Sequence, residues 1–126
     1  VPVGALFADL NGLKTVNDTQ GHPAGDDLIR RAVRVLRRVF RDDEIFRAGG
    51  DEFTVIVPGT TAEEMEAKAR LIREYEASEN DVSFAIGCAV EDDCRNVRTA
   101  LQKADEKMYE DKRRYYALHP ELKRSR

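Results

Sequence analysis

The residues of this chain that could carry out chemistry gather in two short acidic segments. Residues 49–53 read Gly-Gly-Asp-Glu-Phe, so two adjacent carboxylates, Asp51 and Glu52, follow two glycines. Strand-like runs at residues 44–48 and 52–57 flank the glycines. This pattern is typical of a β-hairpin, because glycine adopts the positive φ angles that tight hairpin turns require. Carboxylates held together at a hairpin tip repel each other unless a cation lies there, and a divalent metal ion is the natural candidate.

A second acidic position lies upstream, at the end of a predicted buried strand. The apolar run at residues 3–8 ends at Asp9, and a glycine-containing turn then leads into a short helix, predicted over residues 12–18. A helix start presents unpaired N–H groups and the positive end of the helix dipole, which favour an anion such as phosphate. Alone, the acids of the hairpin could be solvated surface charges. Together with Asp9, they predict a site for a metal ion and a phosphate group.

The rest of the pattern predicts the elements that must bring these two segments together. Further helices are predicted over residues 24–40, 62–77 and 96–115, and a further strand over residues 82–90. Thr61 and Glu64 have the spacing of a capping box, which predicts the start of the helix at residue 62. The resulting order, β-α-α-β-β-α-β-α, predicts an α+β fold of the ferredoxin-like type, an antiparallel sheet with helices packed mainly on one face. In such a sheet the first strand can lie beside the hairpin, so Asp9 and Asp51 are expected to converge on one metal site.

Composition is that of an ordinary globular domain. The 126 residues suffice for one domain with its own core, and 41% of them are hydrophobic and 36% charged. The net charge of -3 argues against a general nucleic-acid surface. No apolar run approaches the roughly 20 residues of a membrane span, and no secretory signal is visible. We expect a cytoplasmic location, which also suits the cytoplasmic portion of a longer, membrane-attached protein, with Cys88 and Cys94 as free thiols.

Several motifs in a fixed order resemble the GGDEF domain of diguanylate cyclases. They are the runs at residues 9–14, 17–18, 21–22, 25–26 and 49–53, and the helical residues at 104–112. This resemblance spans nearly the whole chain. It implies a fold similar to the palm of nucleotide cyclases and polymerases for a domain at residues 1–118, followed by a polar, basic tail at residues 119–126. The family usually has a leader segment before the first strand, which is absent here, so we expect a fragment of a longer protein with a sensory domain upstream.

The resemblance implies an enzyme that condenses two GTP molecules into cyclic di-GMP and releases pyrophosphate. One active site would hold half of the reaction, so a homodimer would be required. The alternative is a catalytically weak or inactive module that binds a guanine nucleotide and regulates a neighbouring domain. We expect weak activity at best from this fragment alone.

Metal and catalytic roles follow from the resemblance residue by residue. Asp9 and Asp51, with the backbone carbonyl of Leu10, would hold Mg²⁺ or Mn²⁺, because these ions prefer hard oxygen ligands. Glu52 would assist at the metal or at the 3′-hydroxyl of GTP, or would shape the electrostatics of the site.

Substrate-binding roles are implied in the same way. Asn17 and Asp26 would read the guanine base, whose N–H groups suit a carboxylate and an amide. Leu13, Lys14 and Lys112 would bind the triphosphate through backbone N–H groups and side-chain ammonium groups.

Two positions depart from the family pattern. Tyr116 stands where many members have an arginine four residues after the lysine, which removes a cation from the expected triphosphate site. The family's product-inhibition motif, Arg-x-x-Asp, has its aspartate at Asp43, but Phe40 replaces the arginine. Because one residue along a helix turns a side chain by about 100°, we expect neither Arg38 nor Arg41 to substitute for it.

Overall fold

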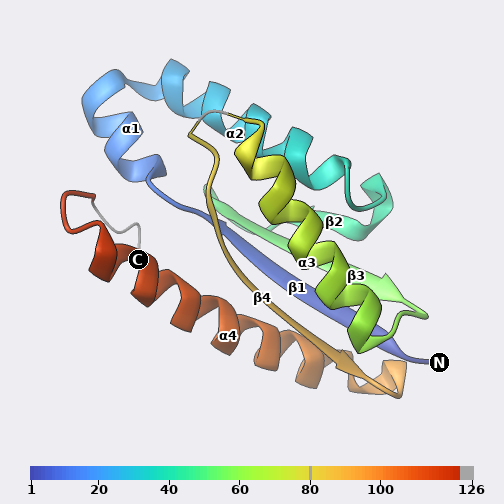
Figure 1. Ribbon diagram of the computed structural model, residues 1–126. Helices are drawn as coiled ribbons and strands as arrows, with labels where there is room; N and C mark the ends of the chain where they lie inside the picture. The colour runs from blue at the N-terminus through green and yellow to red at the C-terminus, as the bar shows by residue number, and fades with distance from the viewer. Residues whose placement is uncertain (80, 123–126) are drawn as a thin grey trace.

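The computed structural model describes residues 1–79 and 81–122 and contains the predicted order of elements (Figure 1). In chain order they are β1 (Val3–Leu10), α1 (Leu13–Gln20), α2 (His22–Arg37), the 3₁₀ helix η1 (Asp42–Glu44), β2 (Ile45–Arg47), β3 (Glu52–Pro58), α3 (Ala62–Ala77), β4 (Phe84–Glu91), the 3₁₀ helix η2 (Cys94–Asn96) and α4 (Val97–Leu118). The predicted α+β class is confirmed. The boundaries of α3 are those predicted, and its first turn is capped as expected, since the hydroxyl of Thr61 accepts a hydrogen bond from the Glu64 N–H.

The four strands form one antiparallel sheet in the order β2-β3-β1-β4. Strand β1 is central, with β3 on one side and β4 on the other. In this register Asp9, near the end of β1, lies opposite Glu52 at the start of β3 and opposite Ala85 near the start of β4. The hairpin and the first strand are therefore neighbours, as the order of elements predicted.

Helices cover both faces of this sheet, which corrects the prediction that they pack mainly on one. Residues of α2 and α3 share a core with Leu6, Ala8 and Leu10 of β1, whereas α4 packs on the opposite face against Ala5 (Figure 1). The physical reason is visible in β1, which is buried at nearly every position instead of at alternate ones. A strand that is apolar at successive positions is covered on both sides.

Helix α4 lies directly against the backbone of β4. A Cβ atom added to Gly87 would collide with the carbonyl oxygen of Ala104 and the backbone nitrogen of Met108, so a side chain at this position would push the helix away. This close packing brings the C-terminal half of α4, which carries Lys112 and Tyr116, to the end of β1 where the acidic residues lie.

The ends of the chain add two observations. Helix α4 continues to Leu118, three residues beyond its predicted end, and residues 123–126 of the predicted basic tail lie outside the described residues. Among the described helices, none has the length and apolar character needed to cross a membrane. Both cysteines are free thiols, as expected.

Candidate functional site

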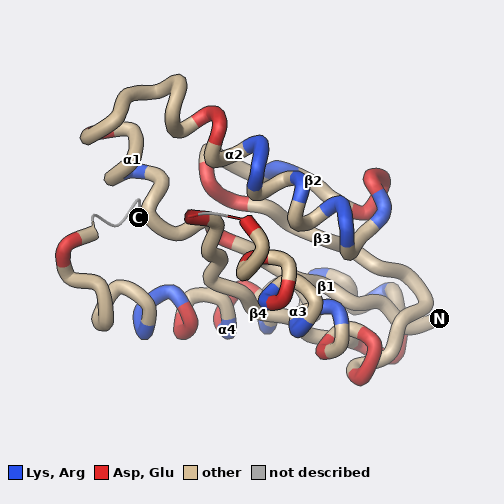
Figure 2. The backbone as a smooth tube through the Cα atoms, turned by 45° about the horizontal axis from the view of Figure 1, so that its top comes forward, with Lys and Arg blue, Asp and Glu red and all other residues tan. Residues whose placement is uncertain are grey.

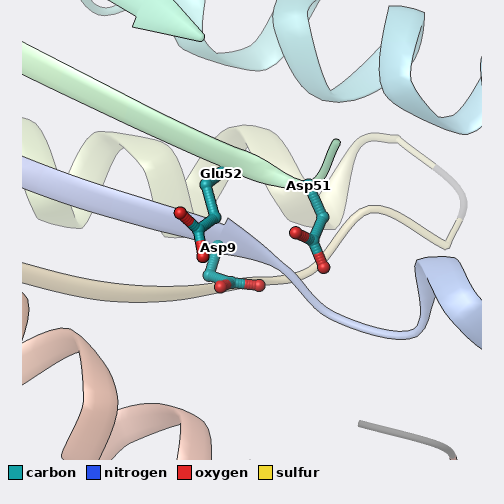
Figure 3. Close-up of side chains that lie close together, drawn as sticks. All are labelled: Asp9, Asp51 and Glu52. Atoms are coloured by element: carbon teal, nitrogen blue, oxygen red, sulfur yellow. The ribbon is translucent and has the colours of Figure 1, made fainter. Parts of the chain in front are cut away.

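Three carboxylates from β1 and the hairpin point toward one another (Figure 3). They belong to Asp9, Asp51 and Glu52, and one oxygen atom from each lies within 4.8 Å of the others. The predicted convergence of Asp9 and Asp51 is therefore confirmed. A set of three hard oxygen atoms at this spacing suits a divalent ion such as magnesium.

The electrostatics of the cluster centre on Asp9, which is 1% exposed. Burial, and then the negative charge of Asp51, raise the pKa of Asp9 from 3.8 to about 6. Lys112 opposes this shift, because its Nζ donates a hydrogen bond to Oδ2 of Asp9 at 3.1 Å and both side chains are buried. The charges of Asp51 and Glu52 raise the pKa of Asp9 and that of Lys112 lowers it, so the cluster is suited to a divalent cation.

The turn that presents Asp51 differs from the predicted tight hairpin. Residues 48–51 separate β2 from β3, and neither Gly49 nor Gly50 has a positive φ angle. A four-residue connection does not need the left-handed conformations that a two-residue turn requires. Arg47 holds the turn instead, since its Nε donates to the carbonyl oxygen of Gly49 at 3.0 Å and its Nη2 to that of Gly50 at 2.8 Å.

The connection from β1 to α1 is tied to its neighbours through its backbone. The N–H of Leu10 donates to the carbonyl oxygen of Asp51 at 2.8 Å, and the N–H of Asn11 donates to that of Ser83 at the same distance. Gly12 then turns the chain with a φ of 80°, and as the N-cap of α1 it has no side chain of its own to cap the helix. A helix start beside the carboxylates, without a cap from its N-cap residue, matches the predicted phosphate site.

A cavity of about 300 Å³ lies between α1 and the hairpin turn. Four of the predicted substrate and metal residues line it: Leu13, Lys14, Asn17 and Asp51. His22, the first residue of α2, also lines it and is exposed. The cavity thus joins the predicted base-reading side of α1 to the carboxylate cluster.

Two predicted substrate residues lie outside the lining of this cavity. Asp26 is exposed in the first turns of α2, and Lys112 is enclosed behind Asp9. Lys14 does lie at the cavity, but it also faces Asp18, with 3.8 Å between its Nζ and Oδ2 of that residue. The structure therefore brings together the three carboxylates and α1, and leaves Asp26 at the periphery of the cavity.

Two contributors to the site escaped the sequence interpretation. The hydroxyl of Tyr116, noted there only as a missing arginine, accepts a hydrogen bond from the Gly12 N–H at 3.0 Å. Asn11 is buried, its Nδ2 donates to the hydroxyl of Ser83 at 3.2 Å, and its Oδ1 has no hydrogen-bond partner among the described residues. The polar residue types were visible in the sequence, but their partners lie about 70 and 100 residues away.

The helical-spacing argument about the product-inhibition motif needs a correction. Phe40 is buried in the core. Helix α2, along which basic residues follow one another (Figure 2), ends at Arg37, so helical spacing does not apply beyond it. Arg41 has an extended backbone and its Nη2 lies 2.9 Å from Oδ2 of Asp43. The helical-spacing argument therefore does not apply to Arg41, whereas Arg38 lies over the ring of Tyr75. That neither arginine takes part in product inhibition stays a prediction.

Comparison with known proteins gives consistent matches. The family model described as diguanylate cyclase, GGDEF domain, matches residues 1–116. Probable diguanylate cyclase DgcI of Escherichia coli K12 is 34% identical over 107 residues, which cover 83% of this chain and 24% of that protein. The chain thus spans about a quarter of the length of this curated relative.

Solved structures agree with these sequence matches. The GGDEF domain of DgcB from Caulobacter crescentus, in complex with c-di-GMP, superposes with a TM-score of 0.79 at 26% identity, over 89% of this chain and 72% of that chain. An EAL/GGDEF domain protein from M. capsulatus is 32% identical, with a TM-score of 0.75 over 90% of this chain and 79% of that chain.

Proposed function

This chain belongs to the GGDEF domain family of diguanylate cyclases, and from that membership we propose that it synthesises cyclic di-GMP from two molecules of GTP in the cytoplasm. The observation that carries the proposal is the cluster of Asp9, Asp51 and Glu52 beside the start of α1, whose N-cap residue is a glycine. Carboxylates for a metal ion and N–H groups for phosphate are the parts that phosphoryl transfer needs.

Asp9 and Asp51, with the backbone carbonyl of Leu10, are the proposed ligands of a magnesium or manganese ion. When bound, such an ion neutralises charge on the phosphate oxygens and favours ionisation of the attacking hydroxyl. The buried ammonium of Lys112 keeps Asp9 more acidic than it would otherwise be, and so keeps it available as an anionic ligand. Glu52 lies opposite Asp9 in the sheet, and we assign it to assist at the metal ion or at the 3′-hydroxyl of GTP.

In the proposed reaction the 3′-oxygen of one GTP attacks the α-phosphorus of the other. A bond forms between that oxygen and phosphorus, the bond from the α-phosphorus to the bridging oxygen breaks, and pyrophosphate leaves. Two such transfers give cyclic di-GMP and two pyrophosphates. Because one domain binds one GTP, two copies of the chain must face each other across a two-fold axis, so we propose a homodimer as the active form.

Recognition of GTP is assigned to the two sides of the cavity at α1. Asn17 and Asp26 read the guanine base, with Asp26 reaching in from the adjacent start of α2. The backbone N–H groups near Leu13 and the ammonium of Lys14 bind the triphosphate. Lys112 contributes positive charge from behind Asp9.

A second candidate is a regulatory module that binds a guanine nucleotide without turnover. One observation favours it: Tyr116 replaces a family arginine with a neutral group at the triphosphate end of the site. The intact set of three carboxylates favours the enzyme, since a module that only binds nucleotide has less need of Glu52 beside the metal ligands.

The test is to incubate the protein with GTP and magnesium and to separate the products by chromatography. We expect cyclic di-GMP and pyrophosphate from the wild type and none from Asp51→Asn, with unchanged thermal unfolding, because a turn residue supports little packing. Asp92→Asn is the control, since Asp92 is an exposed acid beyond the far end of β4. If the wild type at high protein concentration binds GTP but forms no product, the proposal of an enzyme fails and the chain is a regulatory module.

A further inference from the structure

Three successive backbone N–H groups fix the connection between β1 and α1 to three different elements. The Leu10 N–H donates to the hairpin turn at Asp51, and the Asn11 N–H donates to the segment before β4 at Ser83. The third, the Gly12 N–H, donates to the hydroxyl of Tyr116 on α4. These bonds hold the chain from both sides of β1 and from the helix beneath it.

The third bond is buried and joins residues that are far apart in the sequence. Tyr116 is 7% exposed, and its hydroxyl oxygen lies 3.0 Å from the backbone nitrogen of Gly12. Gly12 has a φ of 80° and is the N-cap of α1, so its orientation sets the direction in which the helix begins. Its carbonyl oxygen accepts the first hydrogen bond of the helix, from the Val16 N–H at 3.0 Å.

We propose that Tyr116 is a positioning residue for the triphosphate: through the Gly12 N–H it orients the start of α1, so that the next N–H groups, from Leu13 onward, meet the phosphates. The inference rests on the proposed function. Tyr116 supplies no positive charge, so it cannot replace the ion pair that an arginine would form with phosphate. Tyr116 contributes by fixing the backbone at Gly12 before the ligand binds, so that binding does not have to order this turn.

The same geometry favours ligands with a polyphosphate chain. The Gly12 N–H is already used, so it is withdrawn from the set of donors that phosphate can reach. A ligand with a polyphosphate chain extending from the cavity toward the carboxylates gains from an ordered α1 start, because each N–H there is aimed in advance. A nucleoside monophosphate reaches fewer of these groups and gains less.

The experiment replaces Tyr116 with phenylalanine, which keeps the ring packing and removes the hydroxyl. Amide hydrogen exchange followed by NMR should show that the Gly12 N–H loses protection, while those of Leu10 and Asn11 keep theirs. Calorimetric titration with an α,β-methylene analogue of GTP, in the presence of magnesium, should show an affinity loss of about tenfold, because binding must then also order the turn at Gly12. Affinity for GMP should change little. In the active enzyme the KM for GTP should rise with little change in kcat.

Tyr109→Phe is the matched control, because Tyr109 lies on the same helix and is 39% exposed. It should change neither the exchange of Gly12 nor the preference for triphosphate. Unchanged protection of Gly12 in Tyr116→Phe, or equal losses of affinity for the triphosphate analogue and for GMP, would overturn the proposal. If the wild type forms no cyclic di-GMP but the variant still loses triphosphate affinity selectively, the positioning role stands and the proposed reaction fails.

Discussion

Replacing Lys112 by methionine tests whether the acidic cluster depends on a buried cation. The side chains of Lys112 and Asp9 are 0% and 1% exposed, and 3.1 Å separates Nζ from Oδ2. Methionine keeps most of the volume of the lysine stem but leaves Asp9 with Asp51 and Glu52 as its charged neighbours. Removing one partner of a buried ion pair is costly, by about 3–5 kcal/mol, unless the remaining group can neutralise itself. Asp9 can do so by keeping its proton.

The effect of Lys112→Met on stability can be estimated from the pKa of Asp9. In the wild type the pKa of Asp9 is raised from 3.8 to about 6, so the folded protein binds its proton more tightly than the unfolded chain does. Stability therefore falls as the pH rises from about 4 to about 6 and then levels off. Lys112 lowers the pKa of Asp9, so without it the fall continues above pH 6. The slope is at most about 1.4 kcal/mol per pH unit, or roughly 3 kcal/mol between pH 6 and pH 8.

The assay is urea unfolding followed by circular dichroism at several pH values without metal. The free energy of unfolding of Lys112→Met should be close to that of the wild type near pH 5 and fall below it toward pH 8. Magnesium should reduce this difference by supplying positive charge. Lys103→Met is the control, because Lys103 on the same helix pairs with Glu91 at 3.0 Å but has a side chain that is 55% exposed. The Lys103→Met substitution should lower the free energy of unfolding by less than about 1 kcal/mol at every pH. Parallel curves for Lys112→Met and the wild type would refute the reasoning.

Three further outcomes follow from individual contacts. Gly87→Ala should cost about 1–3 kcal/mol in thermal unfolding, because its Cβ would collide with the backbone of α4, whereas Gly50→Ala meets no atom within 4 Å and should cost little. Asp111→Ala should cost about 1–3 kcal/mol in urea unfolding, since its Oδ2 accepts the Ile86 N–H at the edge of β4; exposed Glu110→Ala should change stability by less than about 0.5 kcal/mol. Asp26→Ala should reduce the preference for GTP over ATP by about tenfold in competition binding, and equal losses for both nucleotides would assign Asp26 to the helix terminus alone.

Much of the fold could be predicted from local patterns. Hydrophobic spacing predicted every strand and α-helix in the right order, and the capping pair Thr61 and Glu64 predicted the start of α3. Helix ends were less accurate: no glycine or proline marks the end of α2, and α4 continues past its predicted end to Leu118, just before His119 and Pro120. The packing of α4 on the second face was missed, although β1, apolar at successive positions, carried the signal.

The predictions about the site were likewise partly right and partly wrong. Asp9 and Asp51 were predicted to converge because adjacent antiparallel strands bring their ends together, and they do. The tight Gly49–Gly50 turn was wrong, since the connection is longer than the motif suggested. The pairing of Arg41 with Asp43 was missed because it depends on where α2 ends, and a helical spacing rule fails beyond that point.

The sequence by itself determined the residue types that the chemistry needs and the order of the elements that carry them. Carboxylates, glycines and apolar periodicity are local properties, and they are readable wherever they occur. The tertiary structure alone decided the partners of these groups: Lys112 against Asp9, and Tyr116 against Gly12. These contacts join residues about 100 positions apart, and their energies depend on burial and on distances of about 3 Å. Burial and distance exist only once α4 has packed across the sheet, so no spacing along the chain could specify them.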